Sequence, residues 1–257
     1  LRPHLVEGLH RRHRLLRDAG LPVPHSLGWS NDGMLVLQAA EGVPMRHQLS
    51  SGGGGLPSGA TLLALLDQLP AEVMELRHRR SWTDNMAHYA RVVGSALPSE
   101  AAQAADLAAR TTDALAGLSA ADATHGDFYE AQLLVGAGQV TGLLDLDSCG
   151  PGRRADDLAC LLAHLAVLAE MKPRHRARLH VIGAGWLADF ETAVDPVELR
   201  FRVAGVLMSL ATGPHRVQER QWQAATRRRL RLVEQWADSA EALERGPAMR
   251  ERSPTTG

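Results

Sequence analysis

The sequence predicts an α+β fold in which helices dominate and one short β-hairpin lies between two helical regions. Apolar residues recur at helical spacing from residue 61 to residue 118 and again from residue 156 to residue 243. Between these regions, two short β-type runs, 132–135 and 140–144, flank a turn that contains two glycines. With 257 residues, of which 45% are hydrophobic, the chain can bury a core in one large domain or two small lobes.

The N-terminal part is predicted to form a helix, a hairpin and a loop. Residues 5–16 follow a loose helical pattern that stops at an Asp-Ala-Gly sequence. The turn sequence Asn31-Asp32-Gly33 separates two short apolar runs, 27–29 and 34–37, which indicates two antiparallel strands. The four glycines at 52–55 lack the Lys-Ser/Thr that completes a phosphate-binding loop, so a flexible loop is the favoured interpretation.

Charge and hydropathy argue against two classes of partner. The net charge of -1 and the pI near 6.9 provide no general attraction to nucleic acid or to an anionic membrane. The arginine-rich segment 227–231 lies among apolar residues and is interpreted as the solvated face of an amphipathic helix. The longest apolar stretch, 158–169, is shorter than the roughly 20 residues that span a bilayer. We therefore expect neither nucleic acid nor membrane as a partner.

Cysteine usage points to a reducing compartment. The two cysteines, Cys149 and Cys160, have the spacing of neither a zinc site nor a redox motif. Two thiols in a chain of this size do not make a disulfide framework. The expected location is therefore cytoplasmic.

Three oxygen-bearing side chains bracket the predicted hairpin. Asp127 precedes the hairpin, Gln132 begins its first run and Asp145 follows its second run. In this arrangement Asp127 can face a substrate hydroxyl, while an amide oxygen and a second carboxylate lie on adjacent strands. That geometry suits phosphoryl transfer, which needs an oriented hydroxyl and hard oxygen ligands for Mg²⁺.

Three sequence blocks around these side chains resemble the aminoglycoside phosphotransferase and choline kinase-like families. His125-Gly-Asp-Phe-Tyr-Glu-Ala-Gln132-Leu-Leu-Val resembles their catalytic loop, and Leu143-Leu-Asp145-Leu-Asp147 resembles their metal-binding strand end. Gly150-Pro-Gly-Arg-Arg-Ala-Asp-Asp157-Leu-Ala resembles the block that follows. The resemblance extends over roughly residues 19–165. Its specificity lies in the order and spacing of the three blocks.

The resemblance implies a protein-kinase-like fold with a small β-hairpin at the active site. Residues 1–42 would form part of an N-terminal nucleotide-binding lobe and the hinge, with the start of that lobe missing. Residues 43–245 would form a mostly helical C-terminal catalytic lobe, and residues 246–257 are expected to be a disordered tail.

The resemblance also implies roles for five residues. Asp127 would be the base or the hydroxyl-orienting residue, and His125 would brace the backbone of the catalytic loop. Gln132 and Asp145 would be the ligands of a Mg²⁺ that accompanies ATP, and Asp157 would be a structural acid. The family usually carries Asn where Gln132 stands, so the amide oxygen is moved outward by one methylene.

In the N-terminal lobe, the resemblance gives a match for one helix residue and for the hinge. Glu7 would correspond to the helix glutamate that pairs with a phosphate-contacting strand lysine in such kinases. The backbone of Gln38, Ala39 and Ala40 would hydrogen-bond adenine. The single lysine, Lys172, follows the catalytic segment, so we expect the chain to be a fragment of a longer protein.

Three further acids are candidates for substrate binding. Glu130 and Asp147, near the catalytic loop, could receive a cationic substrate, or they could be hydrated surface groups. By the resemblance, Asp147 could also support the metal ligands from behind. Asp84 begins a helix that the family often places beside its substrate cleft, although helix capping explains this acid nearly as well.

The expected function is an ATP-dependent phosphotransferase that moves the γ-phosphate to a hydroxyl of a small molecule. An aminoglycoside, a sugar or an amino alcohol would fit. The alternative hypothesis is a truncated, non-catalytic remnant or a small-molecule-binding scaffold. Each motif also has a structural interpretation, as a turn, a strand cap or an N-capping pair, but three unrelated features would rarely fall in this order around a hairpin.

Overall fold

The computed structural model describes residues 3–250, with side chains described from residue 5 to residue 246. These residues divide into two units, 3–79 with 119–193 and 80–118 with 194–250. All strands of the described residues belong to the first unit. The predicted boundary at residue 42 stays a prediction.

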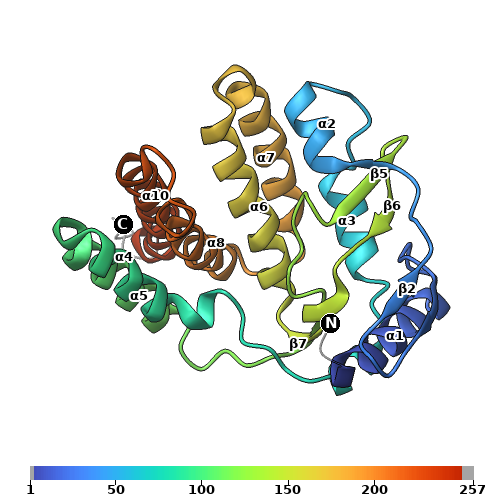
Figure 1. Ribbon diagram of the computed structural model, residues 1–257. Coiled ribbons are helices and arrows are strands. Elements are labelled where there is room, and N and C mark those ends of the chain that lie inside the picture. The colour runs from blue at the N-terminus through green and yellow to red at the C-terminus, as the bar shows by residue number, and fades with distance from the viewer. Residues whose placement is uncertain (1–2, 251–257) are drawn as a thin grey trace. The chain divides into compact units, whose positions relative to one another are not determined.

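The first unit begins with a helix and a hairpin, as the sequence predicted. Helix α1 (Pro3–Asp18) buries Val6, Leu9 and Leu16, which lie along one face. Strands β1 (Ser26–Trp29) and β2 (Leu35–Leu37) are antiparallel. In Figure 1, α1 lies beside this two-stranded sheet.

The second sheet has the strand order β3-β5-β6 and contains the predicted central hairpin. Strands β5 (Leu133–Gly136) and β6 (Gln139–Leu143) pair around Ala137 and Gly138, which both have positive φ. Two positive φ values in a two-residue loop match the right-handed twist of a hairpin. Strand β3 (Val43–Pro44) was not predicted, since two residues carry no pattern of their own.

A third, two-stranded sheet closes the ends of the segment that contains the three motifs. Strand β4 (Asp122–Thr124) pairs antiparallel with β7 (Gly150–Gly152), and the short 3-10 helix η4 (Leu146–Ser148) precedes β7. Neither strand was predicted from the sequence. The pairing brings residues 122–124 against residues 150–152, so the chain between them returns to its starting point.

Helices complete the first unit. Helix α2 (Met45–Ser51) was not predicted, and the glycine-rich segment that follows it is a loop, as predicted. Next come α3 (Gly59–Leu66) and the 3-10 helix η1 (Ala71–Glu75). Helix α6 (Arg154–Met171) lies beside α7 (Arg176–Phe190), with the 3-10 helix η5 (Pro173–His175) between them in the chain (Figure 1).

Helix α6 is buried on nearly all sides. Its apolar residues supply much of the core of the first unit. Across residues 3–250, the helices are too short or too polar to cross a lipid bilayer.

The second unit is helical. Along the chain it consists of the 3-10 helix η2 (Thr83–Asn85), α4 (Met86–Ala96), η3 (Pro98–Glu100), α5 (Ala101–Ala114), α8 (Pro196–Ala211), α9 (Gly213–Arg216) and α10 (Trp222–Arg250). Helix α8 starts where Asp195 accepts hydrogen bonds from two backbone N–H groups and Pro196 occupies the first turn. Helix α5, predicted to reach residue 118, ends at Ala114 and is followed by Gly117 with positive φ.

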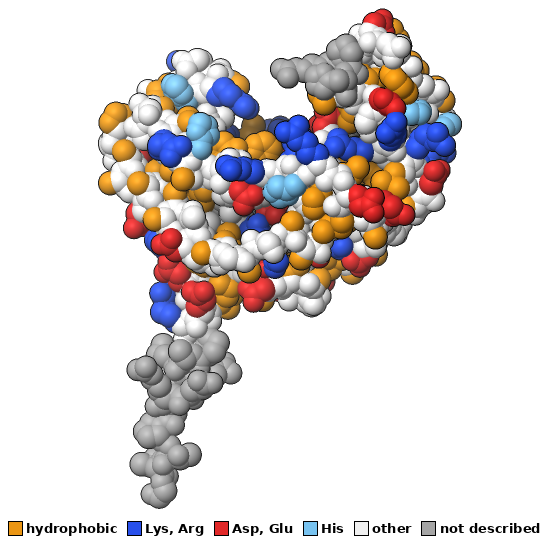
Figure 2. Space-filling view, turned by 90° about the horizontal axis from the view of Figure 1, so that it is seen from below, with side chains coloured by type: hydrophobic (Ala, Val, Ile, Leu, Met, Phe, Trp, Pro, Cys, Tyr) orange, Lys and Arg blue, Asp and Glu red, His pale blue; other side chains and the backbone are white. Residues whose placement is uncertain are grey.

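Helix α10 has the amphipathic pattern that the sequence predicted. Leu230, Val233 and Ala237 are buried, while Arg227 pairs with Glu100 at 2.8 Å. On the face of the molecule seen in Figure 2, acidic, basic and apolar side chains are interspersed. Helix α10 extends to Arg250, and the rest of the predicted tail, 251–257, lies outside the described residues.

Gly205, in the middle of α8, is predicted to be required for packing. A Cβ there would lie 2.7 Å from the side chain of Thr83, so Gly205→Ala should lower the free energy of unfolding by about 1–3 kcal/mol. Gly185→Ala is the matched control, because its Cβ would meet nothing within 4 Å on α7. That change should raise stability by about 0.5–1 kcal/mol. Urea denaturation measures both changes in the free energy of unfolding. Equal changes in the two variants would contradict a packing role for Gly205.

Candidate active site

The turn of the predicted catalytic loop is held by a buried carboxylate. Asp157, on α6, accepts hydrogen bonds from the backbone N–H of His125 at 2.7 Å and of Gly126 at 2.8 Å. Burial raises the pKa of Asp157 to about 7, against the two N–H donors, which lower it. Gly126 has a φ of 82°, and a Cβ there would lie 2.4 Å from the carbonyl oxygen of Ser148. Only glycine therefore fits this turn.

The ring of His125 joins the loop to the end of strand β6. The ring is fully buried, and its Nε2 lies 2.9 Å from the carbonyl oxygen of Leu144. Its Nδ1 accepts a hydrogen bond from the N–H of Asp127 at 3.3 Å. These partners require the proton on Nε2, and burial lowers the pKa of the ring, which keeps it neutral.

Asp145 lies one residue beyond Leu144, at the point where the chain leaves the hairpin. Its φ of 58° and ψ of 67° are left-handed, a conformation that Asp tolerates better than most residues. Two arginines hold the turn that follows: Arg12 donates to the carbonyl oxygen of Asp147 at 2.9 Å, and Arg79 donates to Ser148 Oγ at 2.7 Å.

The side chains of Gln132 and Asp145 meet. Gln132 Nε2 lies 3.1 Å from Asp145 Oδ2 and 3.3 Å from the hydroxyl of Tyr129. The backbone supports this approach, because the N–H of Leu144 donates to the carbonyl oxygen of Gln132 at 2.8 Å. The structure thus brings together the two residues that the sequence predicted as metal ligands.

The pair fits a hard cation such as Mg²⁺. Adjacent ligands at roughly 2.1 Å from an octahedral ion lie about 3.0 Å apart, close to the observed 3.1 Å. The nitrogen and oxygen of an amide can exchange places by rotation of the side chain, which would turn the oxygen of Gln132 toward the ion. Within residues 3–250, no three His, Cys, Asp or Glu side chains form a metal-binding group. Phosphate oxygens and water would therefore complete the coordination.

The carboxylate of Asp127 lies on the same side of the loop as α6. It is half-buried, with Oδ1 at 3.9 Å from the thiol of Cys160. Burial raises the pKa of Tyr129, and the nearby carboxylates of Asp127 and Asp145 raise it further. The Tyr129 phenol therefore stays protonated at neutral pH.

The sequence pattern of the phosphotransferase enzyme family (APH) matches residues 3–187. The chain belongs to this family. The match begins in α1 and ends in α7, so it includes the catalytic loop, the hairpin and α6. A search of curated proteins gave no significant match.

Solved structures share the fold at low sequence identity, and the predicted protein-kinase-like α+β fold is confirmed. A choline/ethanolamine kinase family protein from Mesorhizobium loti is 15% identical, with a TM-score of 0.59 over 87% of this chain and 77% of that one. A thermostable mutant of aminoglycoside phosphotransferase APH(4)-Ia, in ternary complex with ADP and hygromycin B, is 16% identical, with a TM-score of 0.55 over 89% and 83%. An aminoglycoside-3′-phosphotransferase of type VIII is 23% identical, with a TM-score of 0.50 over 76% and 77%.

In this member of the family, the predicted substrate acids lie in different settings. Glu130 is buried, so its interpretation as a hydrated surface group is wrong. Asp147 is exposed, and its backbone is held by Arg12. Asp84 accepts a hydrogen bond from the N–H of Ser81 at 2.8 Å, and its own N–H donates to Ser81 Oγ at 3.2 Å. A role of these acids in substrate binding stays a prediction.

The predicted nucleotide-lobe residues lie on α1 and after β2. Glu7 forms an ion pair with Arg11 one turn further along α1. The N–H of Gln38 donates to the carbonyl oxygen of His25 at 2.8 Å, so this donor is already used within the sheet. The carbonyl of Gln38 and the backbone of Ala39 and Ala40 remain the candidates for adenine. Their role stays a prediction.

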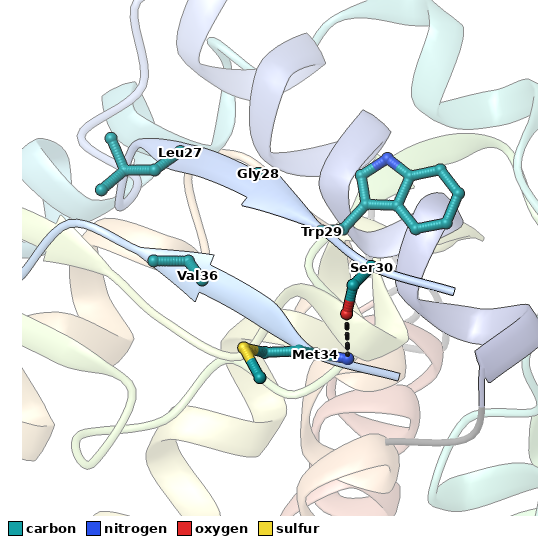
Figure 3. A pocket seen from close by; sticks show the side chains of 6 residues that line it. All are labelled: Leu27, Gly28, Trp29, Ser30, Met34 and Val36. Atoms are coloured by element: carbon teal, nitrogen blue, oxygen red, sulfur yellow. Dashed lines mark hydrogen bonds between the residues drawn. The ribbon is translucent and has the colours of Figure 1, made fainter. Parts of the chain in front are cut away.

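A shallow pocket lies on the β1–β2 hairpin and has a volume of about 320 Å³ (Figure 3). Its apolar side chains come from both strands and the turn, and the N–H of Met34 donates to Ser30 Oγ at 3.4 Å. The lining residues are Leu27, Gly28, Trp29, Ser30, Met34 and Val36. None of them was a predicted site residue.

Sequence reasoning missed the groups that support the site from outside the loop. Cys160 and His164 follow Asp157 at helical spacing, three and seven residues on, so all three lie on one face of α6. Cys160 contacts Asp127, and the ring of His164 stacks on Tyr129 at a centroid distance of 4.1 Å. The spacing from Asp157 was a signal that could have identified both.

The two hydrogen bonds that Asp157 accepts lead to a prediction about stability. Asp157→Asn places an amide N–H₂ against one of the two donors, which should lower the free energy of unfolding by about 2–3 kcal/mol. Asp156→Asn is the same change at the neighbouring residue of the helix terminus and should cost at most about 1 kcal/mol. Urea denaturation of both variants is the measurement. Equal losses would show that the loop does not depend on this carboxylate.

Burial of neutral His125 predicts a pH dependence of stability. The unfolded ring takes up a proton near pH 6.5 and the buried ring does not, so stability is present above pH 6.5 and is lost as pH falls below it. Between pH 7.5 and pH 5.5, the free energy of unfolding of His125→Gln should therefore fall by about 1 kcal/mol less than that of the wild type. His47→Gln, at an exposed position, should follow the wild type. Denaturation curves at both pH values test this, and a parallel pH profile for His125→Gln would contradict it.

Proposed function

We propose that the chain transfers the γ-phosphate of ATP to a hydroxyl group of a small molecule, with Mg²⁺ bound at Gln132 and Asp145. The observation that carries this proposal is the approach of Gln132 Nε2 to Asp145 Oδ2, at 3.1 Å, beside the loop that holds Asp127. Membership of the phosphotransferase enzyme family supports the reaction class. The complex of a similar structure with ADP supports a nucleotide as the phosphate donor.

In this proposal Asp127 receives the hydroxyl of the acceptor. Its carboxylate can accept the hydroxyl proton and orient the oxygen toward the phosphate. The backbone N–H of Asp127 donates a hydrogen bond to His125, which limits movement of the backbone. The thiol of Cys160 contacts the carboxylate and limits its movement. Positioning of this kind is the main protein contribution to phosphoryl transfer.

Gln132 and Asp145 would hold the metal ion on the nucleotide. One neutral oxygen and one carboxylate leave most coordination positions for phosphate oxygens and water, as is usual for Mg²⁺. The ion would neutralise the charge of the phosphates when bound. The strand end supplies rigidity, because Asp145 follows a residue whose carbonyl is held by His125.

The acceptor is proposed only as a hydroxylated small molecule. Aminoglycosides, sugars and amino alcohols remain candidates, because acceptor specificity in a shared fold depends on variable parts of the cleft. The complex of a similar structure with hygromycin B favours an aminoglycoside as the first compound to assay.

Asp127→Asn tests the role of the acid. The change keeps the shape of the side chain and removes the proton acceptor, so ATP-dependent phosphorylation should fall by at least about 100-fold. Asp113→Asn, at an exposed position on α5, is the matched control and should keep wild-type turnover. Phosphate transfer is measured with ATP, Mg²⁺ and a panel of hydroxylated compounds, and circular dichroism verifies that each variant is folded. Unchanged turnover in Asp127→Asn would refute its role.

A non-catalytic scaffold is the second candidate function. This candidate predicts no Mg²⁺-dependent affinity for ADP or ATP. Calorimetric titration of nucleotide in the presence and absence of Mg²⁺ separates the two functions, since the phosphotransferase requires binding that depends on the metal.

A further inference from the structure

Tyr129 contacts the amide of Gln132 from within the catalytic loop. Its hydroxyl lies 3.3 Å from Gln132 Nε2, and the N–H of Gln132 donates to the carbonyl oxygen of Tyr129 at 2.9 Å. The two residues therefore meet through both backbone and side chain. Among the predicted metal ligands, Gln132 has the longer and more mobile side chain, which loses more rotamer freedom when it is fixed.

The ring of Tyr129 is held in place by α6. It stacks on the ring of His164 with centroids 4.1 Å apart and planes inclined by 31°. His164 Nδ1 lies 4.0 Å from Glu130 Oε2, a buried oxygen that itself accepts no hydrogen bond within the described part of the chain. The position of the phenol oxygen is thus set by packing on α6.

The next residue of the loop is anchored from the other side. The carbonyl oxygen of Glu130 accepts a hydrogen bond from the N–H of Arg46 at 3.1 Å. The Glu130 carboxylate lies 3.5 Å from the guanidinium of the same arginine on α2. A shift of the Tyr129 backbone would disturb both contacts, so the loop presents the hydroxyl at a fixed point.

A hydroxyl at this point can serve both orientations of the Gln132 amide. In the structure the amide N–H₂ donates to Asp145 and to the Tyr129 oxygen. A cation bound by Asp145 requires the amide oxygen of Gln132 to turn toward Asp145. Without the cation, that oxygen would face a carboxylate that is also negatively polarised. A phenol both donates and accepts, so its O–H can then donate to the amide oxygen. A phenylalanine ring offers neither contact.

We propose that Tyr129 is a positioning residue that holds the Gln132 amide in place at the cation site, an inference that rests on the proposed function. The hydroxyl compensates for the extra methylene of Gln132 by fixing the amide that the longer side chain carries. Tyr129 touches neither substrate nor phosphate in this role. It acts through Gln132.

The test uses the pair of tyrosines in the chain. Tyr129→Phe keeps the ring that stacks on His164 and removes only the hydroxyl, while Tyr89→Phe makes the same change on α4 in the other unit. Binding of Mn²⁺ in the presence of ADP is followed by electron paramagnetic resonance. We expect Tyr129→Phe to weaken Mn²⁺ binding by roughly 3- to 10-fold, the loss of one hydrogen bond, and Tyr89→Phe to leave it unchanged.

A double-mutant cycle shows whether the hydroxyl acts through the amide. In a Gln132→Asn background the side chain is shorter and no longer reaches the phenol in the same way. Tyr129→Phe should then change Mn²⁺ affinity by less than about 2-fold, which gives a clear coupling between the two positions.

The outcomes separate this inference from the proposed function. If the wild type binds Mn²⁺ with ADP and Tyr129→Phe binds it equally well, the inference is overturned and the proposed function stands. The inference is also overturned if the loss is the same in the Gln132→Asn background, because the hydroxyl would then support only the fold. If the wild type binds no Mn²⁺ with ADP, both proposals fail.

Discussion

The N–H groups of His125 and Gly126 point at one buried carboxylate, and the position of the catalytic loop depends on that pair of hydrogen bonds. Asp157 belongs to α6, the most deeply buried helix of its unit. A carboxylate that accepts hydrogen bonds from two backbone N–H groups fixes both the position and the orientation of the turn. The close approach of Gly126 to Ser148 then brings the loop against the turn that follows Asp145.

From this anchor the site is built by short links, each made by one residue. The His125 ring connects the loop to Leu144, the neighbour of Asp145, and receives the N–H of Asp127. One face of α6 supports the loop at successive turns: Asp157 holds its backbone, Cys160 contacts Asp127, and His164 stacks on Tyr129. A buried helix changes position little, so the groups that it supports keep their geometry.

The parts that could be predicted from the sequence are those with local causes. The central hairpin follows from two β-type runs and a glycine turn, and this pairing is why Gln132 and Asp145 could be expected to meet. Strands β3, β4 and β7 could not be predicted, because each has only two or three residues and pairs with a segment distant in the sequence. The same holds for α2, which has only seven residues.

The remaining differences between the sequence-based predictions and the structure concern which residues are buried. Glu130 looked like a candidate surface acid, yet its backbone and carboxylate contact Arg46, more than 80 residues earlier in the chain. Cys160 was interpreted without reference to the loop and His164 was not singled out, although their spacing from Asp157 placed both on the same face of α6. Tyr129 was part of the quoted motif, but a sequence does not show that its hydroxyl reaches Gln132.

The most direct test of the account is a crystal structure of the protein grown with Mn²⁺ and ADP, with the ion located by its anomalous scattering. The account predicts an anomalous peak in coordination distance of Gln132 Oε1 and an Asp145 carboxylate oxygen, with phosphate oxygens among the other ligands. A peak away from these two side chains, with ADP bound, would contradict it.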